Sequence, residues 1–256
     1  MAVELYNNGK HTCLAFYDLV DEEHDHAVQS NQFLIADSGH GALIDPGGNM
    51  TYNALLMAMQ KYFPSKELQY ILASHPDPDI VASINKWFVA SPCKLMISSL
   101  WTRFIPHFTT GRDIEGRIVG IPDQGCEISI GDSKIVALPA HFMHAEGNFQ
   151  FYDPVAKILF SGDLGVSLVG HNAAEKPVQD FDAHIPKMIG FHRRYMVSNK
   201  ILRFWANMVR QLDIEMIVPQ HGQRFVGKAM CKRLIDWIEG IECGVDLMTQ
   251  ESYRAP

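Results

Sequence analysis

The sequence predicts a layered α/β fold in which two β-sheets pack face to face and helices cover the outside. Two observations support this fold class. The 256 residues are 47% hydrophobic, which is enough for one large core and favours a single domain over residues 1–256. Strand-like segments also precede helix-like segments in each half of the chain, as expected for two packed sheets with outer helices.

Elements of the first half follow from short apolar runs and from helical spacing. Strands are predicted at residues 13–19, 32–36, 42–44, 68–74 and 94–97. Helical segments are predicted at residues 52–62, 80–88 and 99–105. Pro46 and the two glycines after it end the third of these strands, because neither residue type continues a ladder easily.

The second half repeats this order. Strands are predicted within residues 126–138, where a Gly-containing turn interrupts the run, and at 149–152, 158–160 and 214–219. Helices are predicted at residues 197–211 and 228–242. Residues 163–195 are expected to be rich in loops.

Composition excludes several classes of protein. The formal net charge is −7, and no basic stretch long enough to neutralise nucleic-acid phosphates is present. The five cysteines show no C-x-x-C spacing, so we expect neither a disulfide framework nor a cysteine-based zinc or iron–sulfur site. No signal peptide and no apolar run of membrane-spanning length is visible, so a cytoplasmic protein without membrane contact is expected.

A short segment after the predicted strand at 68–74 concentrates groups that bind metals. It contains His75, Asp77 and Asp79, and alternate residues of an extended chain point to one side. Pro76 and Pro78 stiffen the segment and favour an extended backbone before them. The simpler alternative is a polar turn that begins a helix with Asp79 as its cap.

Three further candidates also follow predicted strands. They are His144, Asp163 between Gly162 and Leu164, and His221 before Gly222. A single histidine of this kind is more often a surface or core residue than a ligand. Four separate strand ends that carry ligand-type side chains favour a shared metal site instead. His141 is an alternative to His144.

These motifs, in this order, resemble the metallo-β-lactamase superfamily. The matching pattern is S-H-x-D-x-D, a later histidine, S-G-D and P-x-H-G, and it extends over nearly the whole chain. The resemblance implies a four-layer αβ/βα sandwich of two mixed sheets flanked by helices. It also implies that the metal site lies at one edge of the two sheets.

Within the superfamily, the pattern is most similar to flavodiiron proteins and to the related oxygen-binding diiron domains. Zinc hydrolases usually have H-x-H-x-D-H, whereas this chain has Asp77 at the second position and Ile80 at the last. Residues 142–152, 158–163 and 195–221 also resemble flavodiiron segments. Ile80 removes a histidine that hydrolases use, and an apolar side chain there would also keep the site dry.

The resemblance implies a role for each candidate ligand. His75, Asp77 and His144 would hold a first metal, Asp79 and His221 would hold a second, and Asp163 would bridge them. Two iron ions are implied, with zinc or manganese as alternatives, because imidazole and carboxylate ligands suit all three. Asp77 is one methylene shorter than the glutamate usual in flavodiiron proteins, so its reach to the first metal is open.

Other side chains are candidates for the wall of the site. A hydroxyl from Tyr195 could donate a hydrogen bond to bound dioxygen. His24, His26 and His171 could line the same pocket. For each of these residues, an ordinary position in a loop is an equally good interpretation.

The implied function is a non-haem diiron protein that binds, senses or reduces dioxygen or nitric oxide. No flavodoxin domain and no FMN are expected in this chain, so electrons would come from a separate flavoprotein, or the protein would signal to a partner. A homodimer is consistent with the resemblance. The main alternative is a dinuclear zinc hydrolase that acts on an ester, thioester or lactone, and a structural relic without activity is a third.

Overall fold

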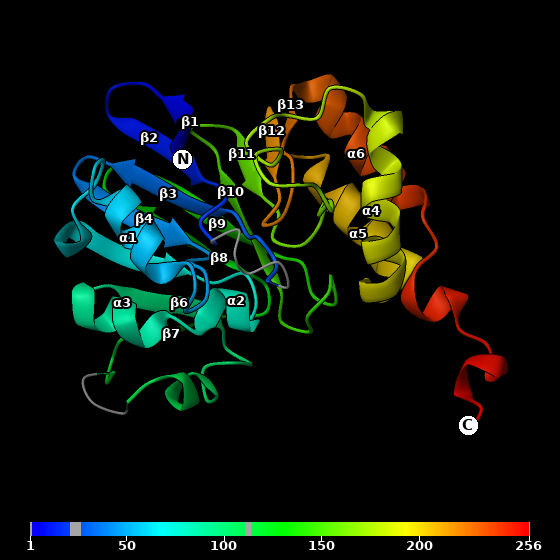
Figure 1. The fold of residues 1–256 in the computed structure, drawn as a ribbon, viewed down its shortest axis with the longest axis horizontal. Coiled ribbons are helices and arrows are strands. Elements are labelled where there is room, and N and C mark those ends of the chain that lie inside the picture. The colour runs from blue at the N-terminus through cyan, green and yellow to red at the C-terminus, as the bar shows by residue number, and fades with distance from the viewer. Residues whose placement is uncertain (1, 21–26, 111–113, 256) are drawn as a thin grey trace.

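The computed structural model describes residues 2–20, 27–110 and 114–255. It has four layers, with two sheets packed face to face between two groups of helices (Figure 1). The fold predicted from the sequence, a metallo-β-lactamase αβ/βα sandwich, is therefore confirmed.

The first sheet contains seven strands within the described residues, in sequence order from edge to edge. They are β1 (Ala2–Asn7), β2 (His11–Phe16), β3 (Gln32–Asp37), β4 (His40–Ile44), β5 (Leu68–Leu72), β6 (Lys94–Ser98) and β7 (Ile118–Ile121). The strands from β1 to β4 are antiparallel, and those from β4 to β7 are parallel. The connections from β4 to β5 and from β5 to β6 contain α-helices, because neighbouring parallel strands need a crossover connection.

Helices α1 (Tyr52–Met59), α2 (Pro78–Val81) and α3 (Ile84–Ala90) pack on the outer face of this sheet. Short 3₁₀ turns occur at Ser65–Glu67 and Ile105–Phe108. The predicted helix at 99–105 is wrong, because this segment consists of turns that lead into the second of these 3₁₀ turns.

The second sheet contains six strands within the described residues, in the order β13-β12-β11-β10-β9-β8. They are β8 (Cys126–Ile130), β9 (Ser133–Pro139), β10 (Phe149–Asp153), β11 (Ile158–Phe160), β12 (Met216–Val218) and β13 (Phe225–Val226). Its outer face is covered by α4 (Phe181–Tyr195), α5 (Asn199–Val209) and α6 (Lys228–Gly240). Two 3₁₀ turns, Gly244–Leu247 and Gln250–Tyr253, follow toward the C-terminus (Figure 1).

Several sequence predictions of local structure need correction. Residues 163–195 were expected to be loop, but their second half forms α4, which Asp180 caps by accepting a hydrogen bond from the Ala183 backbone at 3.2 Å. Pro186 inside the helix concealed it, because proline disfavours helix interiors. The first predicted strand is shifted to His11–Phe16, and β1, β7 and β13 were not predicted.

The inner faces of the two sheets share one apolar layer, in which Phe33 of β3 meets Phe160 of β11 with ring centroids 5.0 Å apart. Both rings are almost completely buried. Burial of each such side chain contributes about 1.5–3 kcal/mol to the free energy of unfolding. The sheets are therefore held in a fixed relation to each other.

Four strand ends meet at one edge of this sandwich. The Phe149 backbone N–H, at the start of β10, donates to the Ser74 carbonyl after β5 at 2.9 Å. The Ser161 backbone N–H, after β11, donates to the Val218 carbonyl at 3.0 Å. The Gln220 backbone N–H donates to the Gly162 carbonyl at 2.8 Å. Backbone hydrogen bonds thus join the loops that carry the candidate ligands in two pairs, one at β5 and β10 and the other at β11 and β12.

Among the described residues, no helix is both long enough and apolar enough to cross a membrane.

Replacing Phe33 with Ala should lower the free energy of unfolding by about 3–5 kcal/mol, because the cavity would lie between the sheets. Chemical denaturation measures this change. Phe204→Ala is the matched control, since that ring is 59% exposed, and it should change stability by no more than about 0.5 kcal/mol. Equal losses in the two variants would contradict a core between the sheets.

Candidate metal centre

The structure brings the six predicted ligand side chains together at the shared edge of the two sheets. They come from the loop after β5 and the start of α2, the loop before β10, and the loops after β11 and β12. The six residues are His75, Asp77, Asp79, His144, Asp163 and His221. Their assignment as ligands stays a prediction, but the convergence on which it depends is present.

One group of donor atoms surrounds Asp77. Its Oδ2 lies 3.6 Å from Nε2 of His75 and 3.4 Å from Nε2 of His144. Oδ2 of Asp163 lies 3.0 Å from His144 Nε2 and 3.8 Å from His75 Nε2. The two imidazole rings meet edge to face, with centroids 4.8 Å apart. Asp77 therefore reaches this group despite its short side chain.

A second group shares Asp163 with the first. Nε2 of His221 lies 3.3 Å from Oδ2 of Asp79 and 3.6 Å from Oδ1 of Asp163. The Asp163 carboxylate thus presents Oδ2 to one group and Oδ1 to the other. This is the arrangement that a bridging carboxylate needs.

These residues fit a pair of metal ions. Donor atoms that are each about 2 Å from a shared ion lie roughly 3 Å or slightly more from one another, as most pairs here do. In addition, Oδ1 of Asp163 is buried and accepts no hydrogen bond from the described residues. A buried carboxylate oxygen without a donor is costly unless a cation satisfies it.

The electrostatics of the cluster also favour bound cations. Burial alone would lower the pKa of His144, but hydrogen bonds to Asp163 and Asp77 raise that pKa to about 10. Burial opposes ionisation of Asp77, yet hydrogen bonds to His144 and His75 lower its pKa. Positive charge among these carboxylates is therefore strongly stabilised, and metal ions would supply it in place of protons.

A chain of hydrogen bonds orients His75. Its Nδ1 lies 2.9 Å from the Ser74 hydroxyl, which donates to Oδ2 of Asp45 at 2.9 Å. The Ser74 backbone N–H donates to Oδ1 of Asp45 at 2.8 Å. With Nδ1 donating to Ser74, Nε2 of His75 is free for a metal. Complete burial raises the pKa of Asp45 to about 6.

His221 and Asp79 are oriented in a similar way. Nδ1 of His221 donates to the Gln29 carbonyl at 2.7 Å, and the Gln220 side chain donates to Oδ2 of Asp79 at 3.1 Å. The Asn31 side chain donates to two carbonyls of the His221 loop, each at 2.9 Å. This loop is therefore fixed before any ligand binds.

His192 of α4 holds the loop that carries Asp163. Its Nδ1 donates to the Met188 carbonyl at 2.8 Å, and its Nε2 accepts from the Gly165 backbone N–H at 3.0 Å. Complete burial lowers the pKa of His192 to about 4, so the ring is neutral and can accept this bond. Gly165 has φ +90°, a backbone conformation that glycine adopts without strain.

Sequence reasoning missed Asp45, Ser74 and His192 as supporting residues. Ser74 stands directly before a candidate ligand, so its position was a usable signal. Asp45 and His192 lie far from their partners in the sequence, so no local signal pointed to them.

A cavity of about 850 Å³ opens over the cluster. Five of the six candidate ligands line it, whereas His75 is buried behind them. Its remaining wall is largely apolar and includes Val20, Val28, Met50, Val166, Leu168 and Phe191. Arg194 also lines the cavity, so the wall combines mostly apolar side chains with a cation.

Tyr195 also lines this cavity. Its ring stacks on Phe191 with centroids 4.6 Å apart, and it meets the His144 ring edge to face at 5.7 Å. The predicted place of Tyr195 beside the cluster is thus what the structure shows. The role of its hydroxyl stays a prediction.

Two of the other candidate histidines lie away from the cluster. His141 donates from Nε2 to the Asp123 carbonyl at 2.7 Å and is separate from the cluster, which contains His144 instead. His171 lies 3.7 Å from Asp18 and does not line the cavity. His24 and His26 lie outside the described residues.

The expected drying effect of Ile80 is wrong. Its side chain is fully buried in the core between the first sheet and its helices, and it does not line the cavity. Because Ile80 follows Asp79 within the short helix α2, the two side chains point in different directions. The apolar wall comes from other loops and from α4.

Comparisons with known proteins agree with this geometry. A family model described as "ODP family beta lactamase" matches residues 28–222. A structure described as the peroxy diiron species of the chemotaxis sensor ODP is 38% identical, with a TM-score of 0.85, and the match covers 96% of this chain and 97% of that chain. The apo state of this sensor from T. denticola is 37% identical, with a TM-score of 0.83.

More distant matches show the fold alone. The flavo di-iron protein from Thermotoga maritima, in a mutant form, is 18% identical with a TM-score of 0.75, over 93% of this chain and 60% of that chain. A curated relative, the uncharacterized protein MJ0732 of Methanocaldococcus jannaschii, is 27% identical over 198 residues. The match covers 75% of this chain, and the chain spans about half the length of that relative, namely 48%.

Replacing Ser74 with Ala should weaken metal binding about 10–100-fold, because His75 would lose the hydroxyl that fixes its orientation. Competition with a coloured chelator measures the affinity. Ser129→Ala, at an exposed position on β8, is the control and should leave the affinity unchanged. If Ser74→Ala bound metal as tightly as the unchanged protein, the orienting role would be refuted.

Proposed function

This chain belongs to the ODP family of beta-lactamase-like proteins, and from that membership we propose that it is a non-haem diiron protein that binds dioxygen as a sensor. The observation that carries the proposal is the Asp163 carboxylate, which faces an imidazole group on each side. The proposal also includes slow reduction of dioxygen at the same site. Nitric oxide is a second possible ligand of that site.

Each candidate ligand has a role in the proposed centre. His75, Asp77 and His144 would hold one iron, Asp79 and His221 would hold the other, and Asp163 would connect them. These donors are nitrogen and oxygen atoms only, which suit iron and also zinc or manganese. One of the similar ODP structures is that of a peroxy diiron species, which favours iron. Two reduced irons would supply the electrons that hold dioxygen.

The protein's own residues would control access to that centre. The largely apolar wall suits a neutral diatomic molecule. Tyr195, held between Phe191 and His144, is the candidate donor of a hydrogen bond to the bound molecule. The buried supports of His75 and of the Asp163 loop keep the ligands in place when the ligand binds or leaves.

A sensor needs a partner to receive its signal. The similar protein from T. denticola is described as a chemotaxis sensor, so we assign this chain a separate signalling partner. A separate electron-donor flavoprotein would be needed only for repeated reduction of dioxygen. We also propose that the protein forms a homodimer. Light scattering measures its oligomeric state in solution.

One observation favours the alternative of a dinuclear zinc hydrolase. The cavity of about 850 Å³ is far larger than a diatomic molecule needs, and it would hold an ester, thioester or lactone. In that case, a metal would lower the pKa of bound water to provide the nucleophile. The metal content of the purified protein distinguishes the oxygen sensor from the zinc hydrolase.

The test is elemental analysis of protein purified without oxygen, with absorption spectra before and after exposure to air. The sensor proposal expects iron as the main metal and a change of spectrum that depends on oxygen. Zinc as the main metal, together with ester hydrolysis, would support the hydrolase. Iron without any response to oxygen would contradict the sensor role.

Replacing Asp163 with Ala or Asn should remove most of both metals, because each ion would lose the shared carboxylate. Metal-to-protein ratios measure the loss, and circular dichroism checks that the variants fold. Asp182→Ala, at an exposed position on α4, is the control and should keep both metals. Full metal content in Asp163→Asn would mean that this residue does not bridge.

Replacing Tyr195 with Phe should weaken dioxygen binding about five- to tenfold, the equivalent of one lost hydrogen bond of about 1 kcal/mol. Stopped-flow measurement of dissociation detects this change. Tyr253→Phe, at a position that is 75% exposed, provides the matched control. Identical dissociation rates for Tyr195→Phe and the unchanged protein would remove Tyr195 from the binding site.

A further inference from the structure

A second cluster of metal-binding side chains lies at the opposite end of the sandwich. Strand β10 begins at Phe149 beside the candidate metal centre and ends at Asp153. At about 3.4 Å per residue, the strand places the two ends roughly 14 Å apart. Asp153 meets His11 and Cys13 of β2 there, so the cluster connects the two sheets.

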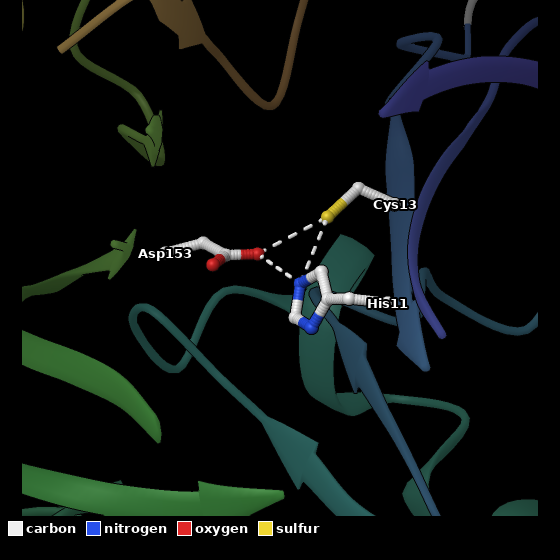
Figure 2. A group of neighbouring side chains, drawn as sticks. All are labelled: His11, Cys13 and Asp153. Atoms are coloured by element: carbon white, nitrogen blue, oxygen red, sulfur yellow. Dashed lines mark hydrogen bonds and ion pairs between the residues drawn. The ribbon is translucent and has the colours of Figure 1, made fainter. Parts of the chain in front are cut away.

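The three donor atoms of this cluster converge on one point (Figure 2). His11 and Cys13 are two residues apart on β2, so their side chains share the face that points to the second sheet. Nε2 of His11 lies 2.7 Å from Oδ2 of Asp153, and the Cys13 sulfur lies 3.1 Å from that same oxygen. Both are hydrogen-bond distances, so these donors would have to move slightly apart to share one ion. The sulfur is 3.6 Å from Nε2 of His11.

Each donor is also oriented by a partner on its far side. Nδ1 of His11 lies 3.0 Å from Oδ2 of Asp37, which leaves Nε2 to face the cluster. Oδ1 of Asp153 accepts from the backbone N–H groups of Val155 at 2.9 Å and Ala156 at 3.1 Å, so only Oδ2 points inward. A carboxylate behind a histidine is the usual support of a metal ligand.

Burial makes this cluster unlike a surface group of polar residues. His11 is 1% exposed, and both Cys13 and Asp153 are 0% exposed. Burial raises the pKa of the Cys13 thiol, and the Asp153 carboxylate raises it further. Burial alone would lower the pKa of His11, but hydrogen bonds to Asp153 and Asp37 raise it. The thiol therefore holds its proton more tightly than a free cysteine does. Both ring nitrogens of His11 face carboxylate oxygens, which accept hydrogen bonds, so both nitrogens can carry protons.

Exchange of protons for a metal ion preserves the charge of this buried site. A divalent ion would displace one proton from the Cys13 sulfur and one from Nε2 of His11. The two positive charges that leave equal the two that enter, so the net charge of the cluster is unchanged. The large cost of burying new charge is therefore avoided.

We propose that His11, Cys13 and Asp153 form a second metal site, which takes one divalent ion of the zinc class and ties the two sheets together. Thiolate, imidazole and carboxylate are ligands that zinc uses in proteins. A site closed on all sides suits a structural ion. The spacing of the cysteines does not predict this site, because the site uses a single cysteine and an aspartate that is distant in the sequence.

This proposal does not depend on the proposed diiron function. The six residues of the candidate metal centre include no thiolate, whereas the second site includes one. Cobalt(II) bound to a thiolate gives a strong charge-transfer band in the near ultraviolet, which carboxylate and imidazole ligands do not give. The band therefore reports the second site even when cobalt also fills the first.

The experiment is expression of the full chain in cobalt-supplemented medium, because a buried site is best loaded during folding. The unchanged protein should show the thiolate band. Cys13→Ser should abolish it and lower the cobalt content by about one ion per chain. Cys126→Ser is the matched control, since this half-buried cysteine lies outside the cluster, and it should keep the band.

Two outcomes would overturn the proposal. One is the absence of a thiolate band in cobalt-loaded, unchanged protein, which would leave a hydrogen-bonded cluster without metal. The other is a band that survives in Cys13→Ser. X-ray absorption of the unchanged protein, with a sulfur neighbour expected around part of the cobalt, needs no variant. Asp153→Asn, which keeps the shape of the side chain, gives an independent check of the ligand set.

Discussion

The shared carboxylate of Asp163 is the interaction on which the rest of this structure depends. One of its oxygens faces His75 and His144, and the other faces His221. The side chain is almost fully buried, and its Oδ1 accepts no hydrogen bond from the described part of the chain. Burial of such a group is unfavourable unless positive charge compensates it, so the surrounding residues suit bound cations.

The layered fold supplies the rigidity that this carboxylate requires. The loops after β5, β11 and β12 and the start of β10 are joined in two pairs by backbone hydrogen bonds. Buried side chains add further support, with Ser74 behind His75 and His192 behind the Asp163 loop. Because these supports belong to different layers, the geometry of the site depends on the packing of the whole sandwich rather than on any single loop.

The two clusters at opposite ends of the sandwich differ in a way that physical chemistry explains. In the candidate metal centre, most donor atoms are more than 3 Å apart and an open cavity lies above them. In the cluster of His11, Cys13 and Asp153, the closest pair is 2.7 Å apart and every member is buried. An open site can exchange ligands and perform chemistry, whereas a fully buried one suits a structural role.

The sequence by itself indicated two packed sheets with outer helices and a set of candidate ligands, because local patterns predict both, and the resemblance of its motifs to a known superfamily implied the rest. Apolar strands end three positions before each of His75, Asp163 and His221, and alternation places His75 and Asp77 on one side of the chain. Only the tertiary structure decided what these residues meet. Helix α4 was concealed by Pro186, and Cys13 meets Asp153 across 140 positions. Local spacing carries no information about such pairs, since packing of distant strands brings them together.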